Sequence, residues 1–199
     1  MAKNVNEKAV KQEKAKEYKP GKNLETMFRT VSRNHMSLSG MADNKAHILL
    51  NINSIIISIV LSVLAHKLIA QHYLILPTVL LLSVCLVSIV FAILTTRPKI
   101  GKGVFTTEQI RNKEVNLLFF GNFHQMNLET YQWGIDEMGR DQDYMQKSLT
   151  TDVYFLGKAL AKKYRYLNIG YRVFMFGLIA SVLAFIGSFL FAYEAHQLV

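Results

Sequence analysis

Residues 73–95 of the chain read YLILPTVLLLSVCLVSIVFAILT, without a single charged side chain. About 20 helical residues cross the roughly 30 Å hydrocarbon core of a bilayer, so this run is long enough to span a membrane. Two further runs of similar character are AHILLNINSIIISIVLSVLA, residues 46–65, and VFMFGLIASVLAFIGSFLFAY, residues 173–193. Buried core helices rarely contain uncharged runs of this length. The sequence therefore predicts three transmembrane helices.

The composition of the whole chain also favours a lipid environment. Of its 199 residues, 51% are hydrophobic and 19% are charged, whereas soluble domains carry about 25% charged residues. The single cysteine, Cys85, excludes an internal disulfide and a metal site built from several thiolates. A compact soluble enzyme is therefore not the expected class of protein.

Lysine and arginine are distributed unevenly around the three runs. The chain contains 23 of them, of which ten precede residue 46 and twelve lie within residues 97–172. The short loop 66–72 contains only Lys67, and none follows Tyr193. Because cytoplasmic loops carry the excess of Lys and Arg, we expect the N-terminus and residues 97–172 in the cytoplasm. The loop 66–72 and the C-terminus are expected on the outer side.

The segments outside the three runs complete the predicted organisation. Residues 1–23 are rich in Lys and Glu and nearly free of large apolar residues, which predicts a disordered charged tail. A juxtamembrane helix is predicted over residues 24–45, and a second helix is predicted from about Asp143 into the third span. The predicted fold is an all-α membrane protein with three transmembrane helices. The first and last extend as cytoplasmic stalks, and residues 97–172 include a small cytoplasmic insert.

The first predicted span carries a stripe of polar side chains. Its members lie within about 80° of one another on a helix with 100° per residue, and they are His47, Asn51, Ser54, Ser58 and Ser62. Polar groups at membrane depth are costly unless they face protein or water, so this stripe is expected to face inward. One interpretation is hydrogen bonding between helices within a monomer or an oligomer. The other is an assembly interface or a water path that opens on activation.

The third predicted span carries a ridge of small residues. Gly177, Ser181, Ala184 and Ser188 recur on one face of the helix. Small residues let helix backbones approach closely in a membrane, so the ridge favours tight helix packing.

Known catalytic patterns are missing from the sequence. It has no Gly-rich phosphate loop, no H-E-x-x-H, no G-x-S-x-G and no paired cysteines. Asp141 and Asp143 are spaced like a metal-binding D-x-D, yet Asp143 and Lys147 also have the helical i, i+4 spacing of a salt bridge. The solvent-facing, salt-bridged helix is favoured. We therefore expect no catalytic residue, no metal site, no cofactor and no enzymatic activity.

Basic residues cluster where the last helix enters the membrane. They are Lys158, Lys162, Lys163, Arg165 and Arg172. Anionic lipid headgroups attract such clusters, and this is the favoured interpretation. Binding of nucleic acid is disfavoured, because the basic residues are interspersed with apolar ones and tied to the membrane.

A candidate site for a small anionic ligand lies just before the first span. A phosphate needs cationic donors, and a base needs a flat apolar face with a few polar edges. Residues 116–123 are rich in aromatic side chains that offer such a face. The candidate binding residues are Arg29, Arg33, Asn34, His35, Asp43, Lys45, Phe120 and Asn122.

Several stretches resemble one known family. TVSRNHMSLSGMADNKA, residues 30–46, followed by NINS, residues 51–54, resembles the transmembrane effector family of bacterial Pycsar antiphage systems. Three later stretches are similar to the same family: NLLFFGNFHQM (116–126), TDVYFLGKALAKKYR (151–165) and FMFGLIASVLAF (174–185). The resemblance covers about residues 24–192, and its core is the A-D-x-K-A motif of residues 42–46 at the mouth of the first span.

The resemblance implies a two-gene defence system. A partner uridylate or cytidylate cyclase, triggered by phage, makes cyclic UMP or cyclic CMP. The membrane effector senses this ligand, with residues 97–172 as the sensing region, and impairs the inner membrane, so the infected cell dies before phage are released. The implied protein is a multi-pass protein of the bacterial inner membrane, with a cytoplasmic N-terminus and a periplasmic C-terminus. From the residues themselves we expect contact with the lipid bilayer and no binding of nucleic acid, and we expect a homo-oligomer because three helices alone enclose little lumen.

Two alternatives stay open from the sequence. One is an accessory subunit that scaffolds a membrane complex and senses no nucleotide. The other is a metal-dependent membrane enzyme that uses Asp141 and Asp143.

Overall fold

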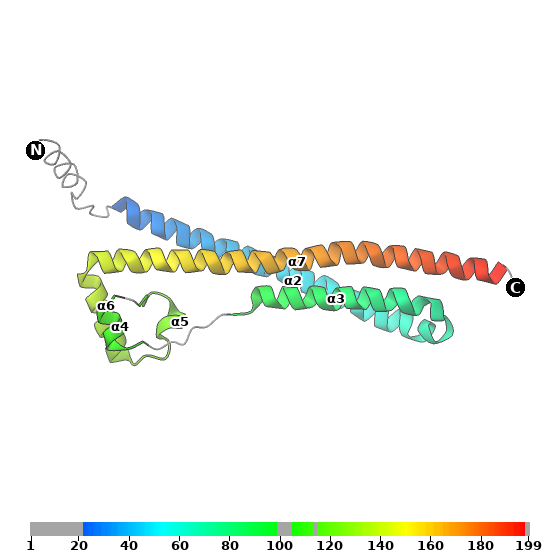
Figure 1. The fold of residues 1–199 in the computed structure, drawn as a ribbon, viewed down its shortest axis with the longest axis horizontal. Coiled ribbons are helices and arrows are strands. Elements are labelled where there is room, and N and C mark those ends of the chain that lie inside the picture. Colours follow the sequence, from blue (N-terminus) through cyan, green and yellow to red (C-terminus); the bar gives the residue numbers. More distant parts are fainter. Residues whose placement is uncertain (1–21, 99–104, 114, 198–199) are drawn as a thin grey trace, which may run out of the picture.

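The computed structural model describes residues 22–98, 105–113 and 115–197, and all regular structure in these residues is helical. Three long helices form a bundle, and three short ones form an insert between the second and third of them (Figure 1). The long helices are α2 (Lys22–Ala70), α3 (Ile75–Thr96) and α7 (Gln142–Gln197). The insert helices are α4 (Thr107–Arg111), α5 (Phe120–Phe123) and α6 (Leu128–Arg140). The predicted tail falls mostly outside the described residues.

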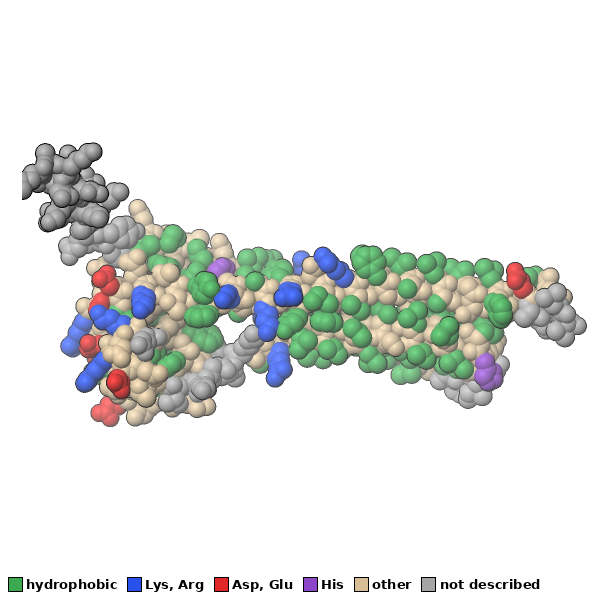
Figure 2. Space-filling view, in the orientation of Figure 1, with side chains coloured by type: hydrophobic (Ala, Val, Ile, Leu, Met, Phe, Trp, Pro, Cys, Tyr) green, Lys and Arg blue, Asp and Glu red, His purple; other side chains and the backbone are tan. Residues whose placement is uncertain are grey.

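All three long helices are long and apolar enough to cross a membrane, which confirms the three predicted spans. The chain runs along the bundle in α2, returns in α3 and runs forward again in α7, so α2 and α7 are parallel (Figure 1). Hydrophobic side chains cover the half of the molecule that contains α3, and charged side chains gather at the opposite end (Figure 2).

The lengths of the helices differ in a way that matters for function. At 1.5 Å per residue, the 22 residues of α3 span about 33 Å, close to the thickness of the hydrocarbon core. The 49 residues of α2 and the 56 residues of α7 span about 74 and 84 Å. Both helices therefore continue well beyond one end of α3, and they continue side by side (Figure 1).

Polar side chains connect the three helices in the middle of the bundle. The Nδ2 of Asn53, a fully buried residue, donates to the Leu49 carbonyl oxygen at 2.7 Å and to Ser88 Oγ at 3.2 Å. Ser88 Oγ donates in turn to the Gly170 carbonyl oxygen of α7 at 3.4 Å. A side chain at Gly170 would lie 3.2 Å from Leu49 and from Phe91, so the absence of one lets the three helices approach.

The small-residue ridge of α7 packs on α3. A Cβ at Gly177 would lie 2.4 Å from Val84 Cγ1, and Ser181 is buried in the same contact region. The predicted tight packing of the third span is therefore confirmed, with α3 of the same chain as the partner. Gly187, nearly three turns beyond Gly177 in α7, has nothing within 4 Å and faces away from the bundle.

The insert has a small hydrophobic core of its own. Ile110, Val115 and Leu117 are buried there, with Trp133 packed against them. Thr106 and Asn127 cap α4 and α6. The Tyr144 hydroxyl of α7 donates to the Val115 carbonyl oxygen at 2.8 Å and thereby ties the insert to the start of α7.

The connection between the first two spans is shorter than the sequence suggested. The helix α2 continues to Ala70, beyond the expected end of the span at residue 65. Only Gln71 and the 3-10 turn His72–Leu74 separate it from α3. No proline or glycine interrupts residues 65–71, so the helix continues until the turn reverses the chain.

Candidate functional site

The polar stripe of α2 faces away from the other helices of the bundle. All five of its side chains are exposed: His47, Asn51, Ser54, Ser58 and Ser62. The helix instead buries Ala46, Leu49 and Asn53 on its opposite face, where alanines let the neighbouring helices come close. The expectation that the stripe faces the other helices of the same chain is therefore wrong, and its interpretation as a contact within an oligomer stays a prediction.

The candidate ligand residues of α2 are spread along the helix rather than gathered in one pocket. Arg29 and Lys45 lie about 24 Å apart along the helix axis, which exceeds the reach of one nucleotide. Arg29 is exposed and donates to Glu25 of its own helix at 2.9 Å. Arg33, Asn34 and Lys45 are exposed as well.

His35 and Asp43 are the members of this set that face α7. A Cβ at Gly157 of α7 would lie 3.5 Å from His35 Cε1, so the imidazole packs against the glycine backbone. The buried His35 Nδ1 has no hydrogen-bond partner among the described residues. Asp43 is partly buried and bound to Lys163, as described next.

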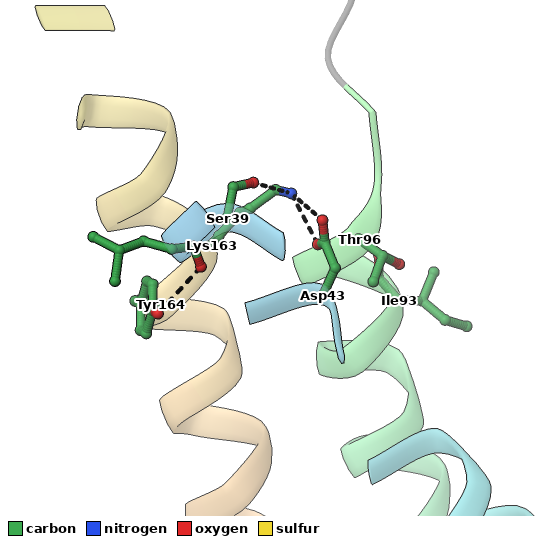
Figure 3. Close-up of polar contacts among 7 residues, drawn as sticks. Ser39, Asp43, Ile93, Thr96, Lys163 and Tyr164 are labelled. Atoms are coloured by element: carbon green, nitrogen blue, oxygen red, sulfur yellow. Dashed lines mark hydrogen bonds and ion pairs between the residues drawn. The ribbon is translucent and has the colours of Figure 1, made fainter. Parts of the chain in front are cut away.

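An ion pair joins the two long helices where α3 ends. Lys163 Nζ donates to both carboxylate oxygens of Asp43 at 2.8 Å and to Ser39 Oγ at 2.9 Å (Figure 3). The neighbouring Tyr164 hydroxyl donates to the Leu38 carbonyl oxygen at 3.2 Å. We call this set of contacts the α2–α7 junction. It occupies Asp43 of the A-D-x-K-A motif, so this carboxylate holds helices together in the structure.

Asn122 has a local structural contact, and it lies in the insert rather than beside α2. Its Nδ2 donates to the Asn116 carbonyl oxygen at 2.6 Å. Asn116 in turn contacts Asp152 of α7, with Nδ2 and Oδ1 3.4 Å apart. Asn116 lies in a loop that leads into the short helix α5, which contains Asn122. The side chain of Phe120 lies outside the described part of the chain.

A groove near these elements lies along α7. It has a volume of about 950 Å³. Its described lining residues are Phe155, Lys158, Ala159, Ala161, Lys162, Arg165, Tyr166 and Ile169. We call it the α7 groove. Figure 2 shows an opening between the bundle and the insert, with Lys and Arg side chains near its edge.

The side chains of the α7 groove combine positive charge with aromatic rings. Lys158 Nζ lies 5.0 Å from the centre of the Tyr154 ring, and Lys162 Nζ lies 5.4 Å from the centre of the Tyr166 ring. Arg165 is exposed on the same side of the helix. Phosphate groups bind to such cations, and bases stack on such rings. The groove can therefore hold a small anion with a planar group.

The groove is connected to the bundle through neighbouring side chains. The Tyr166 ring lies 6.5 Å from the Phe91 ring of α3, centre to centre. Lys162 of the groove precedes Lys163 of the α2–α7 junction in the sequence. The groove and the junction therefore occupy the same turns of α7.

One of the two aspartates considered for a metal site, Asp141, is bound to another residue. Asp141 forms an ion pair with Lys113, and its Oδ1 accepts a hydrogen bond from the Tyr144 backbone N–H at 2.9 Å. The hydrogen bond and charge of Lys113 lower the pKa of Asp141, and Asp141 raises the pKa of Lys113. Because its carboxylate accepts from the Tyr144 backbone N–H, Asp141 is the N-terminal cap of α7.

One known protein family matches most of the chain. The model of the Pycsar effector protein domain matches residues 26–190. The chain belongs to this family. No curated protein and no solved structure matches the chain. The matched residues include α3, most of α2 and α7, the α2–α7 junction and the residues that line the α7 groove.

In this Pycsar effector, sequence reasoning missed the α7 groove. The basic residues that line it were assigned to lipid headgroups, and Phe155 and Tyr166 were not considered. A signal was present, because Phe155, Lys158, Lys162, Arg165 and Ile169 recur every three or four residues and so share one helix face.

Proposed function

We propose that this Pycsar effector senses a cyclic pyrimidine nucleotide, cyclic UMP or cyclic CMP, made by a partner cyclase. Binding leads to impairment of the bacterial inner membrane and so to abortive infection. The family supports the role of an antiphage effector, and the three membrane-spanning helices support action at a membrane. The distribution of Lys and Arg supports a cytoplasmic location for the groove and the junction.

The observation that carries the proposal is the α7 groove. Its volume of about 950 Å³ falls within the range of roughly 300–1,000 Å³ typical of small-molecule sites. Lys158 and Arg165 are placed to bind the single negative charge of the cyclic phosphate. Phe155 and Tyr166 offer apolar faces for the pyrimidine. A cyclic nucleotide needs both features at one place.

The position of the groove suggests how binding reaches the membrane. A ligand held by Lys158, Lys162 and Arg165 places a negative charge on the same turns of α7 as Lys163, which binds Asp43 at the junction. A ligand that binds better when α2 and α7 are rearranged shifts the population toward that arrangement. Because both helices continue into the apolar half of the molecule, the rearrangement is transmitted along them to the bilayer.

Calorimetric titration of the purified full-length protein tests the binding site. We expect cyclic UMP or cyclic CMP to bind, and Arg165→Ala to weaken that binding about tenfold or more, since a charge-assisted hydrogen bond is lost. The matched control is Arg172→Ala, which removes an exposed arginine of the same helix outside the groove. Equal binding by both variants would exclude the α7 groove as the site.

Release of a dye from liposomes that contain the protein tests the second part of the function. We expect release only when the bound cyclic pyrimidine nucleotide is added. An accessory subunit that scaffolds a complex would bind no nucleotide and release no dye. Absence of both binding and release, in protein shown to be folded and inserted, would favour that scaffold and contradict the effector function.

A further inference from the structure

We infer that the polar stripe of α2 is the surface on which a second copy of this chain docks within the membrane. This inference does not depend on the nucleotide or on the α7 groove. It starts from the orientation of one helix, whose inner face is filled by α3 and α7 and whose outer face carries the stripe.

Two asparagines of α2 differ in burial because they lie on opposite faces of the helix. Asn53 is fully buried, and its amide nitrogen is hydrogen-bonded to Leu49 and Ser88. Asn51 lies two residues earlier, hence about 200° around the helix, and is exposed. Its amide has no bond to the other helices of the described structure. An exposed amide at this depth faces acyl chains unless another protein surface covers it.

The stripe is long enough that exposing all of its polar groups to lipid would be costly. From His47 to Ser62 it extends about 22 Å along the helix, most of the hydrocarbon thickness. The Ser58 hydroxyl donates to the Ser54 carbonyl oxygen at 2.9 Å, which lowers the free-energy cost of placing this hydroxyl in lipid. The amide of Asn51 and the imidazole of His47 form no such bond among the described residues, and both are exposed. Polar side chains in a membrane typically face a protein neighbour or water.

A second copy is the occupant that fits best. Copies inserted with the same topology are parallel, so a symmetric contact brings each stripe residue to the same depth as its counterpart. The Asn amide and the Ser hydroxyl each contain a donor and an acceptor, so these residues are complementary to themselves. A lipid tail has neither group. Exposed Ile48, Ile55 and Ile59 border the stripe and add an apolar contact area.

The charges on the same face limit where the copies touch. Arg29 and Arg33 continue the stripe toward the N-terminus, and a symmetric contact there would bring like charges together. Arg29 is compensated by Glu25 of its own helix. We therefore place the contact in residues 47–62. We expect the α2 helices of the two copies to diverge on the N-terminal side of this contact.

Cysteine cross-linking in membranes tests this surface. In the full-length protein with Cys85→Ser, single cysteines are introduced by Ser54→Cys and Ser58→Cys on the stripe, and by Ile52→Cys and Val63→Cys on an exposed apolar flank farther around the helix. Oxidation is carried out with and without cyclic UMP or cyclic CMP. We expect the stripe variants to form disulfide-linked dimers at least about fivefold more than the flank variants, under one condition or both. Equal cross-linking of both sets, or none in any variant, would overturn the inference.

The oligomeric state in mild detergent provides a second readout that needs no cysteine. Asn51→Leu removes the self-complementary amide and leaves an apolar side chain suited to lipid, so the fold is retained. We expect the association constant to fall about tenfold, while the control Ile52→Leu leaves it unchanged. A folded Asn51→Leu protein that associates as strongly as the unaltered chain would contradict the proposed role of the stripe.

Discussion

Asp43 and Lys163 are the residues that hold the two longest helices together where α3 ends. Their side chains retain 33% and 25% of their exposure, so water screens the pair only in part. Ser39 shares the Lys163 ammonium group, which makes the junction a small network rather than a single contact. The network spans helices that are far apart in the sequence, and its loss should loosen α2 from α7.

Replacing Asp43 with Ala leaves the Lys163 ammonium group without its carboxylate. We expect the unfolding free energy in detergent to fall by about 1 kcal/mol, because the remaining charge still reaches some solvent. Glu25→Ala is the matched control, since Glu25 binds Arg29 at a site where both side chains are largely exposed. The exchange Asp43→Lys with Lys163→Asp should restore part of the loss. Thermal unfolding measures all three, and equal effects of Asp43→Ala and Glu25→Ala would contradict the junction's role.

The ion pair between Asp141 and Lys113 makes the insert sensitive to pH. Lys113 lowers the pKa of Asp141 from its ordinary 3.8, so the pair stabilises the fold above about pH 4 and is lost as the pH falls through the lowered value. The raised pKa of Lys113 means that its contribution is present below about pH 10.5 and is lost above the raised value.

We therefore expect Lys113→Gln to destabilise the insert at neutral pH and to matter less in acid. Hydrogen exchange of the backbone amides in α4 and α6 at pH 6 and below pH 4 measures this difference. A destabilisation that is the same at both pH values would show that the ion pair contributes nothing.

The contact between α3 and α7 depends on one glycine. A Cβ at Gly177 would lie 2.4 and 2.5 Å from the two γ carbons of Val84, so any larger residue must push the helices apart. We expect Gly177→Leu to lower stability by about 1–3 kcal/mol, as overpacking does in well-packed cores. Gly187→Leu, in the same helix with open space around it, should change stability by less than about 0.5 kcal/mol.

Unfolding of the two glycine variants in mixed micelles measures this difference directly. A loss confined to Gly177→Leu would establish that α3 and α7 are held by close backbone approach. Similar losses in both variants would instead indicate a general cost of leucine in this helix.

The whole molecule is asymmetric along its long axis. Its apolar half contains α3 and the C-terminal halves of α2 and α7, and its charged half contains the insert and the junction (Figure 2). The proposed topology places the charged half in the cytoplasm. Alkaline phosphatase fused after Val199 should then be active in the periplasm, and a fusion within the insert should be inactive. The reverse pattern would contradict the proposed orientation.

The three spans were predictable because long uncharged helical runs have few alternatives to a membrane. The caps at Thr106 and Asn127 were predictable for a similar reason, since they act on the next three residues of the chain. The ridge at Gly177 was predictable as a close contact, although its partner was not. These features depend on local chemistry and length.

The face of α2 that turns inward could not be predicted in the same way. A helix with polar residues on one side and alanines on another can bury either, and the choice depends on what α3 and α7 present. The small side chains Ala42 and Ala46 allowed close packing, so the bundle took that face and left Asn51 outside. The α7 groove likewise depends on the space between elements that are distant in sequence. From the sequence, its basic residues are equally compatible with contacts to lipid headgroups.

Residues of the chain alone thus establish that this Pycsar effector has three membrane-spanning helices, because hydrophobic transfer is set by each segment's own composition. Tertiary packing alone establishes which polar groups bond within the chain, as the amide nitrogen of Asn53 does, and which stay exposed, as Asn51 does. The difference arises because hydrogen bonds between helices depend on how distant segments are rotated toward one another, and no single segment contains that information.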